Sequence, residues 1–235
     1  MDPTIFSPGG SAALEYAITL LKEKGLGFAE RPCPSVTHLL LPVPAADIRG
    51  IDALLARLPE DVTVIGGNLN LPGKVIDLLK DPTYLAHNAA ITADCAIRVA
   101  GRYLKTVFRD CPVFILGWGR IGKCLAYQLG AMGAKVTVAA RKESDRATAA
   151  SLGFRVCLPQ EVPEDCRILF NTIPAPVLAQ IPSGCIAIDL ASQKGLPGDD
   201  VIWARGLPGK DAPESSGRLI ADTVLRYLYN KEEEI

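Results

Sequence analysis

The chain has no excess of charge of either sign. Its 25 lysine and arginine residues nearly balance its 26 aspartate and glutamate residues, which leaves a formal net charge of −1 over 235 residues. Proteins that bind nucleic acid or an acidic membrane surface through a broad electric field need a strong positive excess, so we expect neither partner. With 49% hydrophobic residues, the chain still has enough apolar side chains for a substantial buried core.

The sequence also lacks a long apolar helix and a secretory leader. The longest uncharged run, residues 168–188, is as long as a membrane span but contains Pro174, Pro176 and Pro182, which disfavour a helix interior. The N-terminus begins Met-Asp-Pro where a leader would carry basic residues and then an apolar stretch. We therefore expect a cytoplasmic protein.

Histidine is scarce, and the cysteines are scattered. The seven cysteines form no C-x-x-C pair, a distribution that does not suit a disulfide framework. The two histidines are His38 and His87, so clustered metal ligands are missing and we expect no metal site. No histidine follows His87, which leaves ordinary keto-acid reduction without its usual general acid.

Short apolar runs alternate with helical periodicity through residues 1–90. Residues 4–6 predict a strand, which is followed by a glycine turn and a helix that Gly25 stops. Two further strands are predicted at 36–41 and 62–66, with a helix around 51–58 between them. This order is typical of a small flavodoxin-like domain with a parallel sheet.

A connector helix and a second alternating series follow. Thr92 is the predicted N-cap of the connector, residues 91–110. Residues 111–213 predict a Rossmann domain, and a final helix over 214–230 is expected to return to the first domain. The strands predicted within the Rossmann domain are 113–116, 136–139, 154–157, 168–170 and 185–189. The predicted fold class is α/β, with two doubly wound parallel-sheet domains.

The sharpest motif is a glycine-rich turn directly after an apolar strand. Gly117, Gly119 and Gly122 form G-x-G-x-x-G, and a helix stopped by Gly133 and another strand follow in the order that a dinucleotide site requires. The glycines permit a tight turn, close approach of a pyrophosphate and helix packing, and the helix N-terminus adds free N–H groups. The predicted cofactor loop is Gly117, Trp118, Gly119, Arg120, Ile121 and Gly122.

The end of the next strand predicts which nicotinamide cofactor binds. An NAD site usually has Asp or Glu there, which accepts hydrogen bonds from the ribose, whereas this chain has Arg141 and Lys142. A guanidinium pairs with a 2′-phosphate, so NADP(H) is the preferred cofactor. NAD(H) stays possible, because Glu143 would take the acidic role if the strand ended two residues later.

Three later segments place polar residues or turns where strands end. The carboxyl ends of strands in an open α/β sheet form the ligand crevice. Residues 206–210 form a Gly-Pro turn before the last helix, where Lys210 would meet an anion. The alternative for each segment is a tight loop needed only for folding. The predicted cofactor contacts here are Asn171, Thr172, Ile173, Asp189 and Ser192.

Seven segments carry a family resemblance that covers nearly the full chain. They are LLLPVP, HNAAITADCAI, GWGRIG, KVTVAAR, FNTIPAPVL, AIDLAS and GLPGKDAP. With them the sequence resembles the dipicolinate synthase A-subunit family and, more distantly, the 2-hydroxy-acid dehydrogenase and S-adenosylhomocysteine hydrolase architecture. The resemblance implies oxidation of a dihydrodipicolinate-type cyclic dicarboxylate to dipicolinate with NADP(H) during sporulation. It also implies a partner, the B subunit of dipicolinate synthase, and a homo-oligomer.

The same resemblance implies anion sites for a dicarboxylate in an interdomain cleft. The candidates are Gly10, Ser11, Asn88, Thr92 and Lys210, and no catalytic residue is assigned. The chain departs from the family where its first glycine turn continues Ser-Ala-Ala in place of Asp, Arg and Gln, and where residues 25–36 are too short for the usual strand and helix. A non-catalytic NAD(P)-binding subunit, or a paralogue acting on another small carboxylate, is therefore the alternative.

Overall fold

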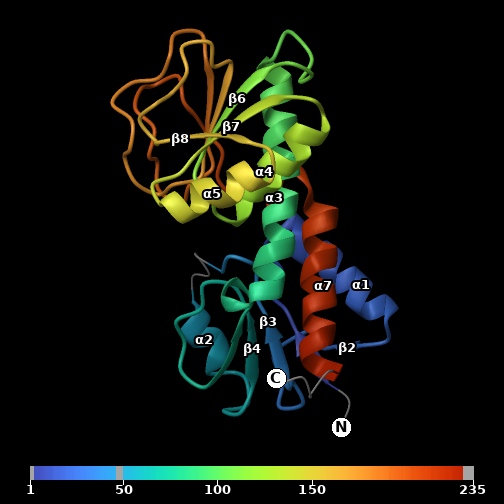
Figure 1. The fold of residues 1–235 in the computed structure, drawn as a ribbon. Helices are drawn as coiled ribbons and strands as arrows, with labels where there is room; N and C mark the ends of the chain where they lie inside the picture. Colours follow the sequence, from blue (N-terminus) through green and yellow to red (C-terminus); the bar gives the residue numbers. More distant parts are fainter. Residues whose placement is uncertain (1–2, 46–49, 230–235) are drawn as a thin grey trace. The chain divides into compact units, whose positions relative to one another are not determined.

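The computed structural model describes residues 3–45 and 50–229 (Figure 1). The chain divides into two compact units. Unit 1 comprises Met1–Asn88 and Pro208–Ile235, and unit 2 comprises Ala89–Leu207. None of the described helices combines the length and hydropathy that crossing a membrane would require.

Unit 1 is built on a five-stranded parallel sheet with the strand order β2-β1-β3-β4-β5. This is the flavodoxin order, so the predicted topology is confirmed. The sequence pattern missed β5, and the segment judged too short for a strand and a helix contains the two-residue strand β2 and no helix. The strands are β1 (Thr4–Phe6), β2 (Gly27–Phe28), β3 (His38–Leu40), β4 (Thr63–Gly66) and β5 (Lys74–Asp77).

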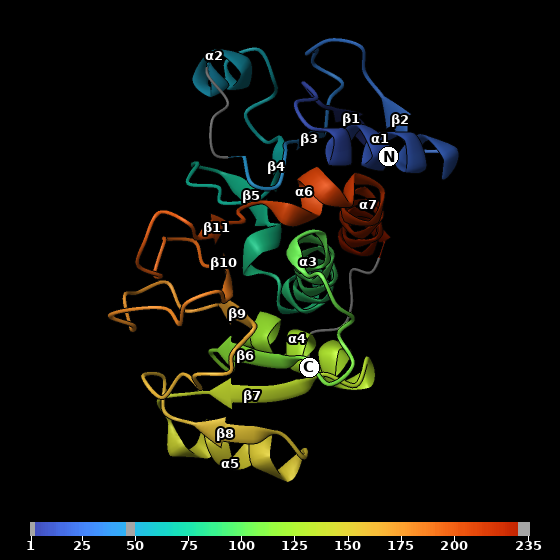
Figure 2. The same cartoon turned by 90° about the horizontal axis from the view of Figure 1, so that it is seen from above.

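Helices α1 (Ala12–Glu23) and α7 (Pro213–Tyr229) lie side by side in unit 1 (Figures 1 and 2). A Cβ atom on Gly217 of α7 would lie 2.4 Å from the carbonyl oxygen of Ala13, so only glycine lets the two helices approach this closely. Ile220 and Val224 of α7 share one buried cluster with Leu14 of α1. The last helix therefore completes the core of unit 1. Residue 230 of the predicted final helix lies outside the described residues.

Helix α3 (Pro82–Tyr103) begins nine residues before the predicted start at residue 91 and ends seven residues before the predicted end at residue 110. The Asp81 carboxylate accepts a hydrogen bond from the backbone N–H of Tyr84 (2.8 Å), and proline suits the first helical position. The same carboxylate accepts hydrogen bonds from the Tyr227 hydroxyl (2.8 Å) and the Arg226 guanidinium, which ties α7 to the start of α3. The predicted N-cap at Thr92 is wrong, because Thr92 lies inside the helix.

Unit 2 contains a six-stranded parallel sheet with the order β11-β10-β9-β6-β7-β8, seen from top to bottom in Figure 2. Counted within the unit, this is the Rossmann order, as predicted. Strand β11 was not predicted, and the segments 172–185 and 190–201 contain no helix. The elements are β6 (Pro112–Leu116), α4 (Arg120–Ala131), β7 (Lys135–Ala139), α5 (Glu143–Ser151), β8 (Arg155–Cys157), β9 (Ile168–Asn171), β10 (Ile186–Asp189) and β11 (Ile202–Trp203).

Three short helices complete the described elements, and one of them changes the prediction for Lys210. Helix α2 covers Ile51–Leu55, the 3₁₀ helix η1 covers Leu78–Lys80, and α6 covers Leu207–Asp211. Lys210 is exposed within α6, so the predicted Gly-Pro turn is instead helical there. Helix α6 begins with Leu207 and Pro208, directly after Gly206, whose φ is +67°. Because proline fits the first turn of a helix, these residues begin a helix where a turn was predicted.

Candidate dinucleotide site

The turn between β6 and α4 requires glycine at both of its ends. Gly117 has a φ of +107°, and a Cβ atom there would lie 2.4 Å from the Oγ1 atom of Thr172. A Cβ atom on Gly122 would lie 2.1 Å from the carbonyl oxygen of Gly117, because α4 packs directly on the turn. These two glycines are needed by the fold itself.

Gly119, between them, has no such requirement. It is the N-cap of α4 with φ −80° and ψ −172°, a conformation open to any residue. Its two chain neighbours aside, no atom of the described chain lies within 4 Å of the position of its absent Cβ. Gly119 supplies no side-chain cap, so the first N–H groups of the helix receive no hydrogen bond from the N-cap side chain. The loop therefore fits a dinucleotide: the open space lies at the helix N-terminus, where a pyrophosphate would approach the backbone.

The other side chains of the loop divide between interior and surface. Trp118 is buried, and its ring packs edge-to-face on Phe154 with the ring centroids 6.0 Å apart. Its indole nitrogen has no hydrogen-bond partner in the described part of the chain. Arg120 is exposed and Ile121 half-buried at the start of α4. The ring of Trp118 thus anchors the loop in the interior of unit 2.

Strand β7 ends at Ala139, just before the residues that were weighed for cofactor choice. Arg141 and Lys142 are exposed just past the strand, whereas Glu143 is the first residue of α5. The strand does not extend by the two residues that the acidic alternative requires. The end of β7 therefore presents cations.

Arg146 is a residue that the sequence reasoning missed. Its Nη1 atom donates to the carbonyl oxygens of Ala140 (2.7 Å) and Arg141 (2.8 Å), so it holds the backbone that carries Arg141. It also brings a third cation to the end of β7. No spacing rule marks it, because the contact depends on how α5 turns back over the strand end.

Asn171 and Asp189, at the carboxyl ends of β9 and β10, form a buried network. Asn171 Nδ2 donates to Asp189 Oδ1 (3.1 Å), and both residues are fully buried. The Asp189 carboxylate also accepts the backbone N–H groups of Ala191, Gly195 and Leu196 at 2.8–3.0 Å. The two side chains therefore shape the loops after β9 and β10, and any contact with a cofactor comes from the loops they hold.

The remaining predicted cofactor contacts lie near Gly117 or on the surface. The Thr172 hydroxyl donates to the carbonyl oxygen of Leu116 (3.0 Å), and Ile173 lies against the space beside Gly117. The structure thus brings together the glycine turn and residues 171–173. Ser192 is exposed after β10.

The predicted substrate residues have separate structural surroundings. Gly10 is exposed with a φ of +121°, and the Ser11 hydroxyl accepts the backbone N–H of Leu14 (3.2 Å) as the cap of α1. Asn88 and Thr92 lie within α3, one turn apart, and Lys210 is on α6. Gly10, Ser11, Asn88 and Lys210 belong to unit 1, and Thr92 belongs to unit 2.

Histidine chemistry is missing from unit 2, because residues 89–207 contain no histidine. In unit 1, His38 of β3 lies 2.8 Å from the Thr37 hydroxyl oxygen, and burial lowers its pKa below the ordinary value. Among the described residues, no group of three or more His, Cys, Asp and Glu side chains is arranged to hold a metal ion.

Comparison with known proteins agrees with the site. Residues 88–177 match the family model "D-isomer specific 2-hydroxyacid dehydrogenase, NAD binding domain". The chain is 25% identical over 237 residues to the A subunit of dipicolinate synthase from Bacillus subtilis (strain 168), covering 85% of this chain and 80% of that protein. These findings support the resemblance to the dipicolinate synthase A subunit that the sequence motifs carry.

Solved structures of the dipicolinate synthase A subunit have the same fold. The crystal structure from Bacillus halodurans gives a TM-score of 0.84 at 24% identity, over 97% of this chain and 98% of that chain. The crystal structure from Bacillus subtilis gives 0.82 at 23% identity, over 99% and 98%. A transhydrogenase from Sinorhizobium meliloti gives 0.66 at 12% identity, over 97% and 92%.

Proposed function

We propose that the protein is an NADP-dependent oxidoreductase that converts a dihydrodipicolinate-type cyclic dicarboxylate to dipicolinate. The observation that carries the proposal is Gly119, a glycine that the chain itself does not require, at an uncapped helix N-terminus inside a Rossmann turn. Similarity to the dipicolinate synthase A subunit and to an NAD-binding dehydrogenase domain supports the reaction class. When bound, NADP⁺ would accept a hydride from the dihydro ring, giving NADPH, dipicolinate and a proton released to water.

The residues of unit 2 would hold the cofactor in three ways. The backbone N–H groups at the start of α4 would bind the pyrophosphate, which is where a helix favours an anion. Gly117 and Ile173 would line the same wall. Arg141, held by Arg146, would pair with the 2′-phosphate, and Lys142 would add charge beside it.

The substrate and the biological setting belong to the same proposal. Gly10, Ser11, Asn88, Thr92 and Lys210 are the candidate positions for the carboxylates, by resemblance to the family. We further propose that the protein acts with a B subunit, as a homo-oligomer in the cytoplasm, during sporulation. A proton released from the ring needs no histidine, since water accepts it.

A non-catalytic NAD(P)-binding subunit is the second candidate, and the first glycine turn favours it. Ser11 uses its hydroxyl to cap α1, where the family pattern has charged and amide side chains. The test is to follow the absorbance of reduced nicotinamide with reconstituted A and B proteins and enzymatically generated dihydrodipicolinate. Turnover supports the enzyme. Tight NADPH binding without turnover supports the binding subunit, or a paralogue if another small carboxylate is turned over.

Cofactor choice is tested by Arg141→Asp. We expect NADPH affinity to fall by about 10- to 100-fold, because a pair with phosphate contributes on the order of 1.5–3 kcal/mol. Calorimetry would measure it, with Arg155→Asp, an exposed arginine on β8, as the matched control of equal charge change. Unchanged NADPH affinity in Arg141→Asp would remove this residue from the site.

A further inference from the structure

Two cysteines meet at the amino edge of the unit 2 sheet, opposite the edge of the glycine turn. Cys166 lies in the turn before β9, and Cys185 immediately precedes β10, the neighbouring strand. Their sulfur atoms lie 3.5 Å apart. A disulfide needs about 2.05 Å, so the sulfurs would have to approach by roughly 1.5 Å.

The two thiols differ in access. Cys185 is half-buried and lines a cavity of about 460 Å³, together with residues 179–184 and 197–201. Cys166 is buried and borders a small cavity of about 60 Å³. The larger cavity has room for a small disulfide compound beside Cys185.

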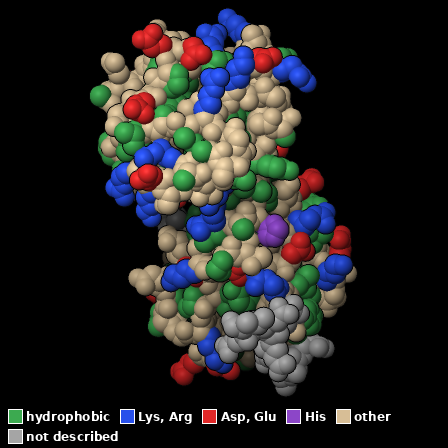
Figure 3. Space-filling view, in the orientation of Figure 1, with side chains coloured by type: hydrophobic (Ala, Val, Ile, Leu, Met, Phe, Trp, Pro, Cys, Tyr) green, Lys and Arg blue, Asp and Glu red, His purple; other side chains and the backbone are tan. Residues whose placement is uncertain are grey.

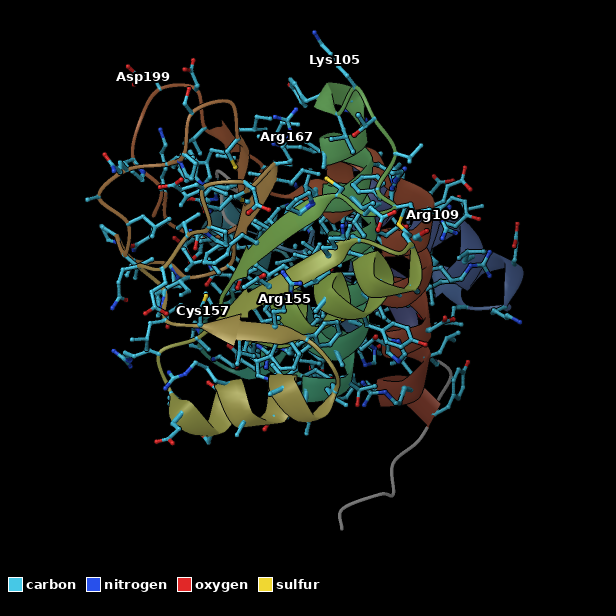
Figure 4. The ribbon with its side chains drawn as sticks, turned by 45° about the horizontal axis from the view of Figure 1, so that its top comes forward. Lys105, Arg109, Arg155, Cys157, Arg167 and Asp199 are labelled. Atoms are coloured by element: carbon cyan, nitrogen blue, oxygen red, sulfur yellow. The ribbon has the colours of Figure 1, made fainter. Side chains whose placement is uncertain are left out.

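The surroundings favour Cys185 as the reacting thiolate. The contact between the two sulfurs lowers the pKa of Cys185 and outweighs the burial that raises it. The same contact raises the pKa of Cys166, and burial raises it further. The charge of Arg167 also lowers the pKa of Cys185. Figure 4 labels Arg167. Elsewhere in unit 2, Lys and Arg side chains gather over the end of α3 and the loop that follows it (top of Figure 3).

We propose that Cys185 and Cys166 form a thiol modification site that reacts with small disulfides and closes to an intramolecular disulfide. The Cys185 thiolate attacks one sulfur of the compound, forming a mixed disulfide and releasing one thiol. Cys166 then loses its proton to water, attacks the Cys185 sulfur and releases the second thiol. Two cysteine thiols are oxidised, and one disulfide compound is reduced to two thiols. The contact with Cys185 and the negative charge of Cys185 raise the pKa of Cys166. Formation of the mixed disulfide removes that charge, so Cys166 loses its proton more easily.

The test is to treat the full folded chain with cystamine, trap free thiols by alkylation, and digest with trypsin and Glu-C without reduction. Cleavage at Glu164, Arg167 and Lys194 isolates each cysteine of the pair, since Cys157 falls in another peptide. We expect peptide 165–167 to be linked to peptide 168–194. This outcome does not depend on nucleotide binding, so it can fail independently of the proposed function.

Variants separate the two roles. In Cys166→Ser the cysteamine adduct should remain on Cys185, and in Cys185→Ser the thiol of Cys166 should stay free. Cys111→Ser, which removes a buried thiol before β6, should keep the linkage. If the folded wild type keeps both thiols alkylatable while other cysteines react, the proposal is overturned. This outcome is measured on the wild-type protein, so it overturns the proposal even if one of the variants does not fold.

Discussion

The two units solve the same local problem in different ways. Each has a glycine-containing turn between a strand and the first helix of its sheet, β1 to α1 in unit 1 and β6 to α4 in unit 2. In unit 1 the Ser11 hydroxyl satisfies an N–H group of the helix. In unit 2 the cap is Gly119, which offers no side chain. The turn in unit 1 satisfies a helix N–H group with its own side chain, whereas the turn in unit 2 leaves N–H donors that can bind an anion.

Gly119→Val should break this comparison most strongly. The branched side chain would fill the space that a pyrophosphate needs, so we expect dinucleotide affinity to fall by at least about 100-fold. The fold should persist, because, its two chain neighbours aside, no atom of the described residues lies within 4 Å of the added Cβ. Calorimetry and circular dichroism check the two parts. A folded variant that binds NADPH normally would show that the pyrophosphate lies elsewhere.

Asp81→Asn should weaken unit 1 while leaving unit 2 intact. Asparagine keeps one acceptor oxygen for the N–H of Tyr84. It places an NH2 donor where the second carboxylate oxygen accepts from Tyr227 and the partly exposed Arg226, so we expect a loss of about 2–4 kcal/mol. Both tryptophans, Trp118 and Trp203, lie in unit 2. Denaturation followed by circular dichroism should therefore shift, while tryptophan fluorescence should not.

The control for that variant is Asp94→Asn on α3. Asp94 lies 3.4 Å from Arg98 in an exposed i,i+4 ion pair, which is expected to contribute less than about 0.5 kcal/mol. An equal effect of the two substitutions would mean that the Asp81 network does not anchor unit 1.

Acid should reproduce part of the Asp81 effect. Burial raises the pKa of this carboxyl, but its hydrogen bonds from Tyr84, Arg226 and Tyr227 outweigh burial and hold the pKa below the usual value. A lowered folded pKa stabilises the protein above the unfolded value of about 3.9, and the contribution disappears as the pH falls through the folded pKa. Unfolding titrations below about pH 4 should show a shallower loss in Asp81→Asn than in the wild type.

Ser11→Ala should have the smallest effect. Removing the cap hydroxyl of α1 should cost unit 1 about 1 kcal/mol, and Ser11→Gly only a few tenths. Nucleotide affinity should not change in either variant, since the open turn is in unit 2. A clear loss of NADPH affinity on Ser11→Ala would contradict the separation of the two turns.

The sequence predicted the fold well because the buried strands of parallel sheets are continuous apolar runs. The strands it missed, β2, β5 and β11, are short edge strands with no buried residue. The start of α3 was misplaced because Thr92 also satisfies the N-cap rule. Asp81 followed by proline was an equally good signal and is the one the structure uses.

The candidate site was predictable as a loop but not as a network. Periodicity places Gly119 after a strand and before a helix, and the structure agrees. Sequence periodicity does not predict that Asn171 and Asp189, which are 18 residues apart, form a hydrogen bond. It also does not predict that Cys166 and Cys185 are in contact. Such contacts depend on the register between neighbouring strands, which a single sequence leaves unspecified.

The packing of α7 on α1 affects how the protein is made. The cluster around Leu14 remains open until Ile220 and Val224 have left the ribosome, whereas every residue of unit 2 has already been synthesised by then. The nucleotide-binding half is therefore the first that can reach its native state during translation. Until α7 has been synthesised, the apolar cluster of unit 1 lacks part of its packing. Unit 1 is therefore the half that we expect a chaperone to bind during translation.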